Sequence, residues 1–444
     1  MSWLRRYHVR LYLRNSIWVF PSLSIVAGLV SVTLLSRLED AYGLEMDVSL
    51  DTARTVMGVV ASSMFALLVL VCSAVLVAVQ LASAQLTPRV IALIYRDTFR
   101  KVALSLFVFN FTFSVGVLVR LEGAVPLLTG YIAAYGFLLN LSIFLYFVDG
   151  VGKMLRPSSV LRSIALSGRE VVASVYPRPL DERHSKPPAA IKWLEEEPER
   201  VVLNEEDGAM LAFDLKGLVS LAGRANCLVE LVPEVGDFIA AGDPLFHVFR
   251  GGTKLSDDAL RYSVAIGHER TLEQDPMFAF RVMVDIASKA LSPAINDPTT
   301  AVLAIDQIHH LLRDVGKRYL ADGRETDAAG QVRFVYRTPD WEDFVLLSVT
   351  EIRQYGRESV QVMRRLRAML ENLIETLPER RAPLLRKELT LLENSAKRTF
   401  PDLDDQTLAG KGDLQGLGGS WEEHQEPSPT DGACARPTVG SGAA

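Results

Sequence analysis

Four segments of the chain are each about as long as a bilayer-spanning helix and contain no Asp, Glu, Lys or Arg. These uncharged segments are residues 16–36, 55–88, 102–119 and 123–148. A helix needs roughly 20 mostly apolar residues to cross the hydrocarbon core, because no water there can satisfy free backbone groups. The pattern therefore predicts an α-helical membrane protein whose residues 1–150 form a four-helix transmembrane domain. The spans are expected at about residues 16–36, 55–82, 102–121 and 124–148.

The charged residues are divided unequally along the chain. Residues 1–150 carry 11 Lys+Arg and 8 Asp+Glu, whereas the other 294 residues carry 36 and 45. The average of 49% hydrophobic and 23% charged residues thus combines an apolar third with a charged two thirds, which excludes a single soluble globule and a disordered chain. Three scattered cysteines exclude a disulfide scaffold. Neither part is basic enough for a dominant role in binding nucleic acid.

Basic residues gather on one side of the expected spans. Lys and Arg are enriched in loops that remain in the cytoplasm, so their positions orient the chain. The basic residues before the first span, after the second and after the fourth are Arg5, Arg6, Arg10, Arg14, Arg89, Arg96, Arg100, Lys101, Lys153, Arg156, Arg162 and Arg169. The loop between the first two spans is acidic instead. We predict that both termini and the charged two thirds lie in the cytoplasm.

Polar residues recur on one face of the second span. At helical spacing this face carries Ser73, Gln80, Ser83 and Thr87, with Ser62 further toward the start of the span. One interpretation is interhelical hydrogen bonding and close packing of small residues. The other is a stripe that lines a permeation path in a homo-oligomer, since four helices leave little room for a pore within one chain. The expected spans contain no carboxylate or His that could form a proton relay.

The remaining sequence predicts a connector, a folded domain and a tail. Residues 151–200 are Pro-rich and charged, which is typical of a connector. Residues 201–400 alternate strand and helix patterns and predict an α+β cytoplasmic domain, with tight Gly-Asp turns near residues 236 and 242 like those of small barrel-sandwich modules. From residue 401 to 444 little apolar material is left to bury, so a disordered tail is expected.

Two Asp-Pro pairs mark the starts of two helices in this domain. Asp275-Pro276 and Asp297-Pro298 each place a capping carboxylate before a proline at the first helical position, which predicts helices over 276–291 and 298–319 that form a hairpin. A set of polar residues would surround the second helix start, where free N–H groups attract anions. The set is Arg270, Arg281, Asp285, Lys289, Asn296, Asp297, Thr299 and Thr300. The competing interpretation is that the carboxylates only cap helices and the charges pair on a solvated face.

Motifs of known catalytic chemistry are missing from the sequence. It has no GxSxG elbow, no HExxH, no Walker A loop and no GxGxxG after a strand. The adjacent His309 and His310 cannot direct both rings at one metal from a single helix. We therefore expect no catalytic residues, metal site or cofactor, and a chain that is not an enzyme.

Three stretches carry a resemblance to a known family. They are residues 80–89 (QLASAQLTPR), 270–281 (RTLEQDPMFAFR) and 285–301 (DIASKALSPAINDPTTA). The chain resembles the predicted bacterial membrane proteins called domain of unknown function 2254, over roughly its first 400 residues. The resemblance implies a multi-pass protein of the bacterial inner (plasma) membrane. It supplies no established activity, substrate or catalytic residue.

Two functions of different kinds follow as hypotheses. The first is an integral membrane protein that forms an oligomeric channel or permeation pathway, gated or assembled by its cytoplasmic domain. The second is a membrane-anchored sensor or scaffold that binds a cytoplasmic anion or partner at the helix start over residues 296–300. Its partners would be the lipid bilayer, further copies of the chain and an unidentified small ligand.

Overall fold

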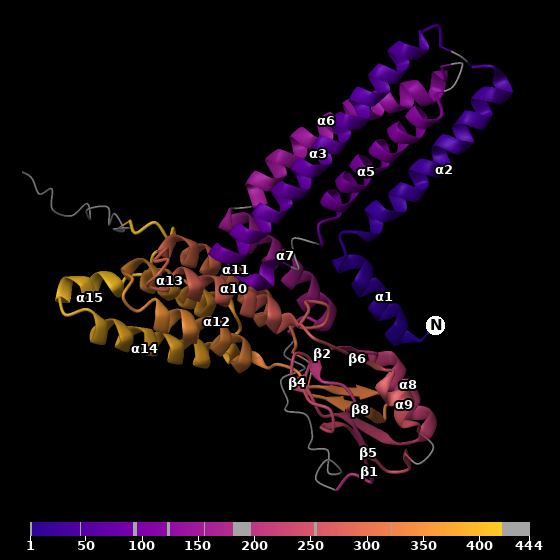
Figure 1. Ribbon diagram of the computed structural model, residues 1–444. Helices are drawn as coiled ribbons and strands as arrows, with labels where there is room; N and C mark the ends of the chain where they lie inside the picture. Colours follow the sequence, from indigo (N-terminus) through magenta and orange to yellow (C-terminus); the bar gives the residue numbers. More distant parts are fainter. Residues whose placement is uncertain are drawn as a thin grey trace, which may run out of the picture.

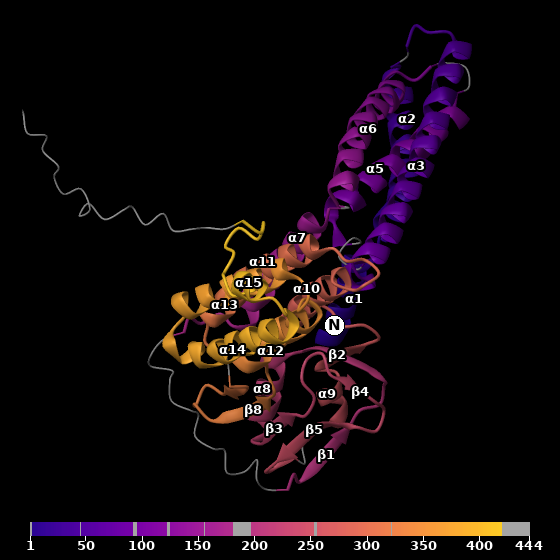
Figure 2. The same cartoon turned by 90° about the vertical axis from the view of Figure 1, so that its left-hand side faces the viewer.

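The long apolar segments form four helices, each long and apolar enough to cross a membrane. In the computed structural model they are α2 (Val19–Tyr42), α3 (Leu50–Gln85), α5 (Thr98–Val119) and α6 (Leu127–Met154). The structure describes residues 2–44, 46–91, 96–121, 125–154, 156–180, 197–252, 255–320 and 322–419. The four helices project together from one side of the remaining protein (Figures 1 and 2). Their ends match the predicted spans to within six residues.

The bundle buries one face of each helix and leaves the other faces exposed. Met64, Phe107 and Phe113 are fully buried between the helices. Asn140 is also buried, and its side-chain amide donates a hydrogen bond to the carbonyl of Leu106 at 3.3 Å. Interior polar groups of this kind tie neighbouring spans together.

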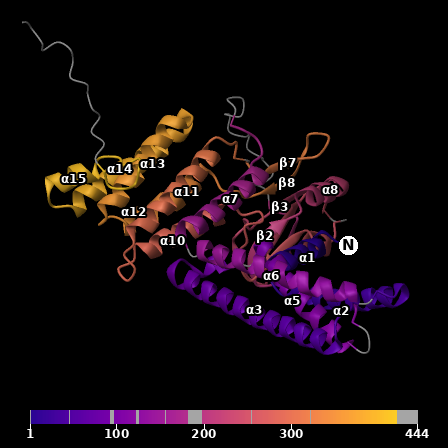
Figure 3. The same cartoon turned by 90° about the horizontal axis from the view of Figure 1, so that it is seen from above.

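A separate short helix precedes the first span. This helix, α1 (Trp3–Asn15), ends at Ser16, whose backbone bonds back to Tyr12. Its apolar side packs on the outer face of a small sheet, so α1 lies between the bundle and that sheet (Figure 1). Figure 3 gives the same region from above. The contacting residues are Trp3, Leu4, Tyr7 and Leu11 of α1 with Ala209, Leu211 and Ala265 of the sheet. No helix is predicted from the sequence for this segment.

The strands form two sheets, which we call the sheet unit. One has the order β1-β5-β3-β8-β7 and the other β4-β2-β6. The strands are β1 (Arg200–Leu203), β2 (Gly208–Phe213), β3 (Leu228–Leu231), β4 (Phe238–Ile239), β5 (Pro244–Phe249), β6 (Val264–Gly267), β7 (Arg324–Thr326) and β8 (Val332–Tyr336), with helices α8 (Leu215–Ala225) and α9 (Asp257–Arg261). Neighbouring strands run antiparallel, except that β3 and β8 run parallel to each other. The expected Gly-Asp turns are present, with Gly236 and Gly242 at φ of +99° and +93°.

The remaining helices pack into a second layer, which we call the helical unit. They are α7 (Pro157–Val175), α10 (Pro276–Ala290), α11 (Pro298–Gly316), α12 (Trp341–Tyr355), α13 (Val360–Thr376), α14 (Ala382–Thr399) and α15 (Leu403–Ala409), with short 3-10 turns η1 (Pro88–Val90) and η5 (Glu379–Arg381). α10 and α11 form the predicted hairpin, and both pack against α7. Gly168 of α7 allows this approach, because an added Cβ there would lie 2.7 Å from the Cβ of Ala279.

Two parts of the predicted organisation need correction. The expected connector at 151–200 contains α7, an amphipathic helix whose Leu161, Ile164 and Val172 are fully buried in the helical unit. The expected disordered tail at 401–444 begins with α15 and an ordered turn in which the Asp413 carboxylate accepts hydrogen bonds from backbone N–H groups of Gly416 and Gly418. Residues 181–196 and 420–444 lie outside the described part of the chain.

Candidate functional site

The helix α3 belongs to both the bundle and the helical unit. Its 36 residues measure about 54 Å at 1.5 Å per residue, whereas a hydrocarbon core is about 30 Å thick. Ala82 and Leu86, near its end, are buried together with Val90 of η1 in the core of the helical unit. One continuous helix therefore connects the bundle with the helical unit. We call the sheet unit and the helical unit together the extramembrane domain.

A lysine of α10 closes the last turn of α3. The ammonium group of Lys289 donates a hydrogen bond to the main-chain carbonyl of Ser83 at 2.9 Å. The last carbonyls of a helix have no partner within that helix and carry partial negative charge, so a cation is favoured there. Lys289 thus provides a direct polar link between α3 and α10.

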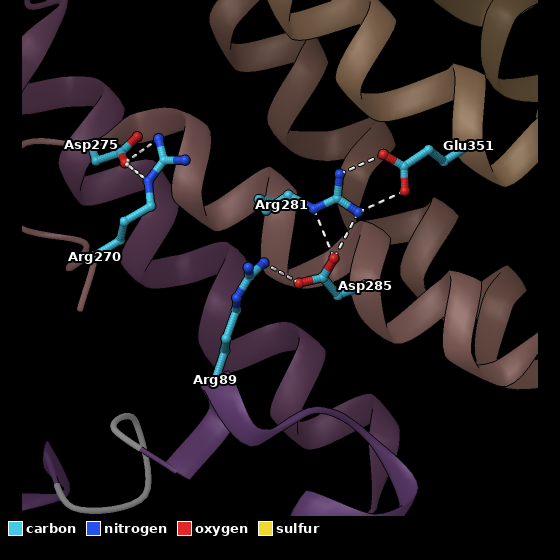
Figure 4. A network of polar contacts seen from close by, with 6 residues as sticks. All are labelled: Arg89, Arg270, Asp275, Arg281, Asp285 and Glu351. Carbon is cyan, nitrogen blue, oxygen red and sulfur yellow. Dashed lines mark hydrogen bonds and ion pairs between the residues drawn. The ribbon is translucent and has the colours of Figure 1, made fainter. Parts of the chain in front are cut away.

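A chain of alternating charges continues from this junction across three elements. Arg89 of η1 pairs with Asp285 of α10, and Asp285 also accepts hydrogen bonds from Arg281 one turn earlier (Figure 4). Arg281 then binds both carboxylate oxygens of Glu351 on α12, at 2.6 and 2.7 Å. The hydrogen bonds from Arg281 hold the pKa of Glu351 below its usual range. The two-pronged geometry fits the planar guanidinium of Arg better than the ammonium of Lys.

A second ion pair stands at the other end of α10. Asp275 caps the helix by accepting a hydrogen bond from the Phe278 N–H at 3.0 Å, and it also accepts one from Arg270 at 3.0 Å (Figure 4). Its side chain is only 3% exposed, and this burial raises the pKa of the Asp275 carboxyl against the lowering effect of Arg270. The guanidinium of Arg270 lies directly against Gly236 of the sheet unit. Asp275 therefore anchors the start of α10 to the sheet unit.

The start of α11 is occupied by a carboxylate of the chain itself. Asp297 accepts hydrogen bonds from both the backbone N–H of Thr300, at 3.1 Å, and its hydroxyl, at 2.5 Å. Asn296 precedes it in the left-handed conformation, with φ of +48°, and is exposed together with Thr299. The Asp297 carboxylate fills the position that an external anion would take at this helix start.

The predicted anion-site residues are spread along α10 rather than gathered in one pocket. Arg270 lies at the start of α10, Arg281 and Asp285 near its middle, and Lys289 with the residues 296–300 near its end. Over 15 residues this helix is about 22 Å long. All three basic residues already bind a carboxylate or a carbonyl within the described chain. An anion or partner site at 296–300 stays a prediction.

The predicted polar stripe divides into an exposed part and a buried part. Ser73 and Gln80 are exposed on the side of α3 that faces away from the bundle. Ser83 is half-buried and Thr87 is buried at the junction with the helical unit. The stripe thus begins on an outward face of the bundle and ends inside the α3–α10 junction.

Sequence reasoning did not identify Glu351 as part of this network. Glu351 is 70 residues from Arg281 in sequence, and no local pattern distinguishes it from the other acidic residues of its helix. Arg89 was noted only as a flanking charge of the second span. Within the described ranges, no three His, Cys, Asp or Glu side chains are grouped so that they could hold a metal ion.

Comparison with known proteins gives a family but no activity. A family model described as "Predicted membrane protein (DUF2254)" matches residues 14–372. An uncharacterized protein of Mycobacterium bovis and one of Mycobacterium tuberculosis are each 28% identical over 432 residues, covering 91% of this chain and 80% of the relative. No solved structure matches the chain.

Proposed function

The chain belongs to the DUF2254 family of predicted membrane proteins, and we propose that it forms a homo-oligomeric, non-enzymatic channel of the bacterial inner membrane, with α3 at the axis of the oligomer. The extramembrane domain lies in the cytoplasm in this proposal and gates the channel through α10. The concentration of Arg and Lys near that end of the bundle supports the orientation.

The outward face of α3 is the observation that carries the proposal. Positions along it alternate in steps of four and three residues, the 3.5-residue repeat of helices that pack with left-handed crossing. The face comprises Ser62, Ala66, Val69, Ser73, Leu76 and Gln80, all of which are exposed in the single chain. The opposite face, which includes Met64, Val71 and Ala78, is buried against the bundle. Polar residues facing lipid are unfavourable, whereas small residues permit close helix packing and polar groups suit a water-filled axis.

The junction with α10 supports the gating part of the proposal. Ala82 and Leu86 are buried in the helical unit, and Lys289 binds the carbonyl of Ser83. Any displacement of α10 therefore acts on the end of the same helix that would line the axis. The paired charges of Arg89 and Asp285 provide a second attachment beside it.

Cysteine modification of reconstituted protein tests the position of α3. In a variant with Cys72, Cys227 and Cys434 replaced by Ala, either Gln80→Cys or Leu81→Cys is introduced and ion flux is measured in liposomes with a charged thiol reagent. Neighbouring helical positions at the same depth differ by about 100° in direction, so Leu81 is a matched control. We expect flux that the reagent blocks in Gln80→Cys and not in Leu81→Cys. Equal block at both positions contradicts the assignment of α3 to the axis.

Two further results decide whether a channel exists. Wild-type protein that shows no flux at any tested salt, pH or membrane tension overturns the proposal. The size and symmetry of the detergent-solubilised protein give an independent check. A ring with α3 at its centre supports the channel, and a monomer contradicts it.

A second candidate function is a membrane-anchored sensor or scaffold. A basic cavity beside α1, lined by residues of the bundle and of the helical unit, favours it because a bound anion there would touch both parts of the protein. A protein that binds an anion in this cavity but conducts no ions would support this candidate over the channel.

A further inference from the structure

A cavity of about 1200 Å³ lies where the bundle meets the extramembrane domain. Its walls come from four elements: α1, the first turns of α2, the first turns of α5, and α7. It is separate from the α3–α10 junction, and none of the residues discussed there lines it. A ligand in this cavity would therefore bind whether or not the protein forms a channel.

One face of α1 forms a wall of this cavity. The residues Trp3, Leu4, Tyr7 and Leu11 attach the other face of α1 to the sheet unit. The cavity is lined by Arg6, Val9, Arg10 and Leu13, which share the opposite side of the helix at helical spacing. α1 thus presents two arginines and two aliphatic side chains to the cavity while its position is held by the sheet.

The lining carries a strong excess of positive charge. It holds six basic residues and one acidic residue: Arg6, Arg10, Arg14, Arg96, Arg100, Lys101 and Asp97. Asp97 pairs with Arg100, and Glu273 at the edge pairs with both Arg14 and Arg96. Even with Glu273 included, this count leaves four positive charges without a matching carboxylate among the described residues. Burial lowers the pKa of Arg96 against the raising effect of Glu273, and the nearby Arg14 lowers it further.

Two of the arginines are available to a ligand. Neither Arg6 nor Arg10 forms an ion pair with any residue in the described part of the chain, and both are exposed toward the cavity. Lys101 is 5% exposed, and its ammonium group donates to the carbonyls of Leu13 and Arg14 at the end of α1. Lys101 thereby fixes the end of α1 to the start of α5 and adds its charge to the same wall.

The other half of the cavity is apolar and runs along the candidate spans. Phe20, Leu23 and Ala27 contribute from α2, and Val102, Leu106 and Phe109 from α5. The seven helical steps from Phe20 to Ala27 cover about 10 Å along the helix axis. The cavity therefore changes from cationic beside the extramembrane domain to hydrocarbon-like within the bundle.

We propose that this cavity binds one anionic phospholipid from the leaflet on the side of the extramembrane domain. The phosphate lies between Arg6 and Arg10, with the buried charge of Lys101 behind them, and the upper part of an acyl chain lies between α2 and α5. Basic pockets between spans bind acidic headgroups in this way, and each Lys or Arg near an anionic surface adds favourable energy. A soluble anion would use the arginines but leave the apolar wall in contact with water.

Native mass spectrometry and thermal unfolding of the full-length protein in detergent test the proposal. The probes are phosphatidylglycerol, phosphatidylcholine and inorganic phosphate at equal concentration. We expect one phosphatidylglycerol retained per chain and a rise in the unfolding temperature with that lipid alone. An equal rise with phosphatidylcholine or with inorganic phosphate overturns the proposal, because the first shows no headgroup selectivity and the second no need for the acyl chain.

A pair of double variants locates the bound lipid. Arg6→Gln with Arg10→Gln removes the two unpaired arginines, and phosphatidylglycerol should then bind at least about tenfold more weakly. Arg5→Gln with Arg162→Gln removes the same charge from exposed positions of α1 and α7 that do not line the cavity. This control should keep the wild-type affinity. Equal weakening in both variants would overturn the site, since it would mean that overall charge alone attracts the lipid.

Discussion

The ammonium group of Lys289 on α10 donates a hydrogen bond to the carbonyl of Ser83, 206 residues earlier in the chain, at 2.9 Å. This bond joins the extramembrane domain to the backbone of a candidate membrane span rather than to one of its side chains. A substitution in α3 therefore cannot remove it, whereas a substitution at Lys289 can. The junction can be weakened from the side of α10 without altering the span.

Lys289→Met is expected to loosen the end of α3. The aliphatic part of the side chain is kept, but the carbonyl of Ser83 loses its charged donor, at a cost of about 1–2 kcal/mol. Hydrogen exchange of backbone amides over residues 82–91 should become faster than in the wild type. Lys387→Met, at an exposed position of α14, is the control and should leave this exchange unchanged.

The ion pair between Arg281 and Glu351 should show measurable coupling. A double-mutant cycle with Arg281→Gln and Glu351→Gln isolates the interaction between the two side chains. Because both terminal guanidinium nitrogens bond Glu351 and Arg281 is only 23% exposed, we expect a coupling of about 1 kcal/mol in the free energy of unfolding. The more exposed pair of Arg386 and Glu379 should give a smaller coupling. A larger value there would contradict the importance of the α10–α12 pair.

Gly236→Ala is expected to destabilise the contact between the sheet unit and α10. Gly236 has φ of +99°, and an added Cβ would lie 1.8 Å from a terminal nitrogen of Arg270. The substitution therefore strains the backbone and displaces Arg270 from Asp275, which should cost about 1–3 kcal/mol. Gly223→Ala in α8 is the matched control, because nothing lies near its added Cβ, and it should stabilise by about 0.5–1 kcal/mol. Unfolding in denaturant measures both.

The Glu234 carboxyl should make stability depend on pH. Burial, followed by the nearby Asp237, raises the pKa of Glu234 to about 7. Between the ordinary pKa of a Glu, about 4.3, and this value, the folded state binds more protons than the unfolded state. The contribution of the protonated Glu234 to the free energy of unfolding is therefore fully present below pH 4.3 and is lost as the pH rises toward 7.

Glu234→Gln tests this dependence directly. The variant keeps the shape of the side chain and cannot ionise, so it should be more stable than the wild type above pH 7, by at most about 4 kcal/mol. The difference should shrink as the pH falls to 5. A difference that does not change over this range would contradict the raised pKa of Glu234. Asp237→Asn is not an equivalent test of this pH dependence. The Asp237 carboxylate accepts a hydrogen bond from the backbone N–H of Glu234, so this substitution also changes a structural contact.

The elements that the sequence predicted well are those with local signals. Asp275-Pro276 and Asp297-Pro298 start α10 and α11 where expected, since a cap and a proline act on the first turn alone. The four long spans were equally predictable, because length and lack of charge are enough to identify them. α1 was missed because it is short and rich in Arg, and only its contact with the sheet unit gives it a stable position.

The candidate site was less predictable because its contacts are distant in sequence. The face of α10 that carries Arg281, Asp285 and Lys289 was evident from their four-residue spacing. Their partners on η1, α3 and α12 were not, since those contacts exist only after the helices pack. The same holds for α7, whose amphipathic pattern lies in a region with the composition of a connector.

From the length of α3 we expect the bilayer to influence the extramembrane domain. A long apolar helix accommodates a thinner membrane by increasing its tilt and a thicker one by decreasing it. The end of α3 is buried beside α10 and bound to Lys289, so a change in tilt must either bend α3 or move the α10–α11 hairpin. A change in bilayer thickness would then be transmitted through α3 to the helical unit.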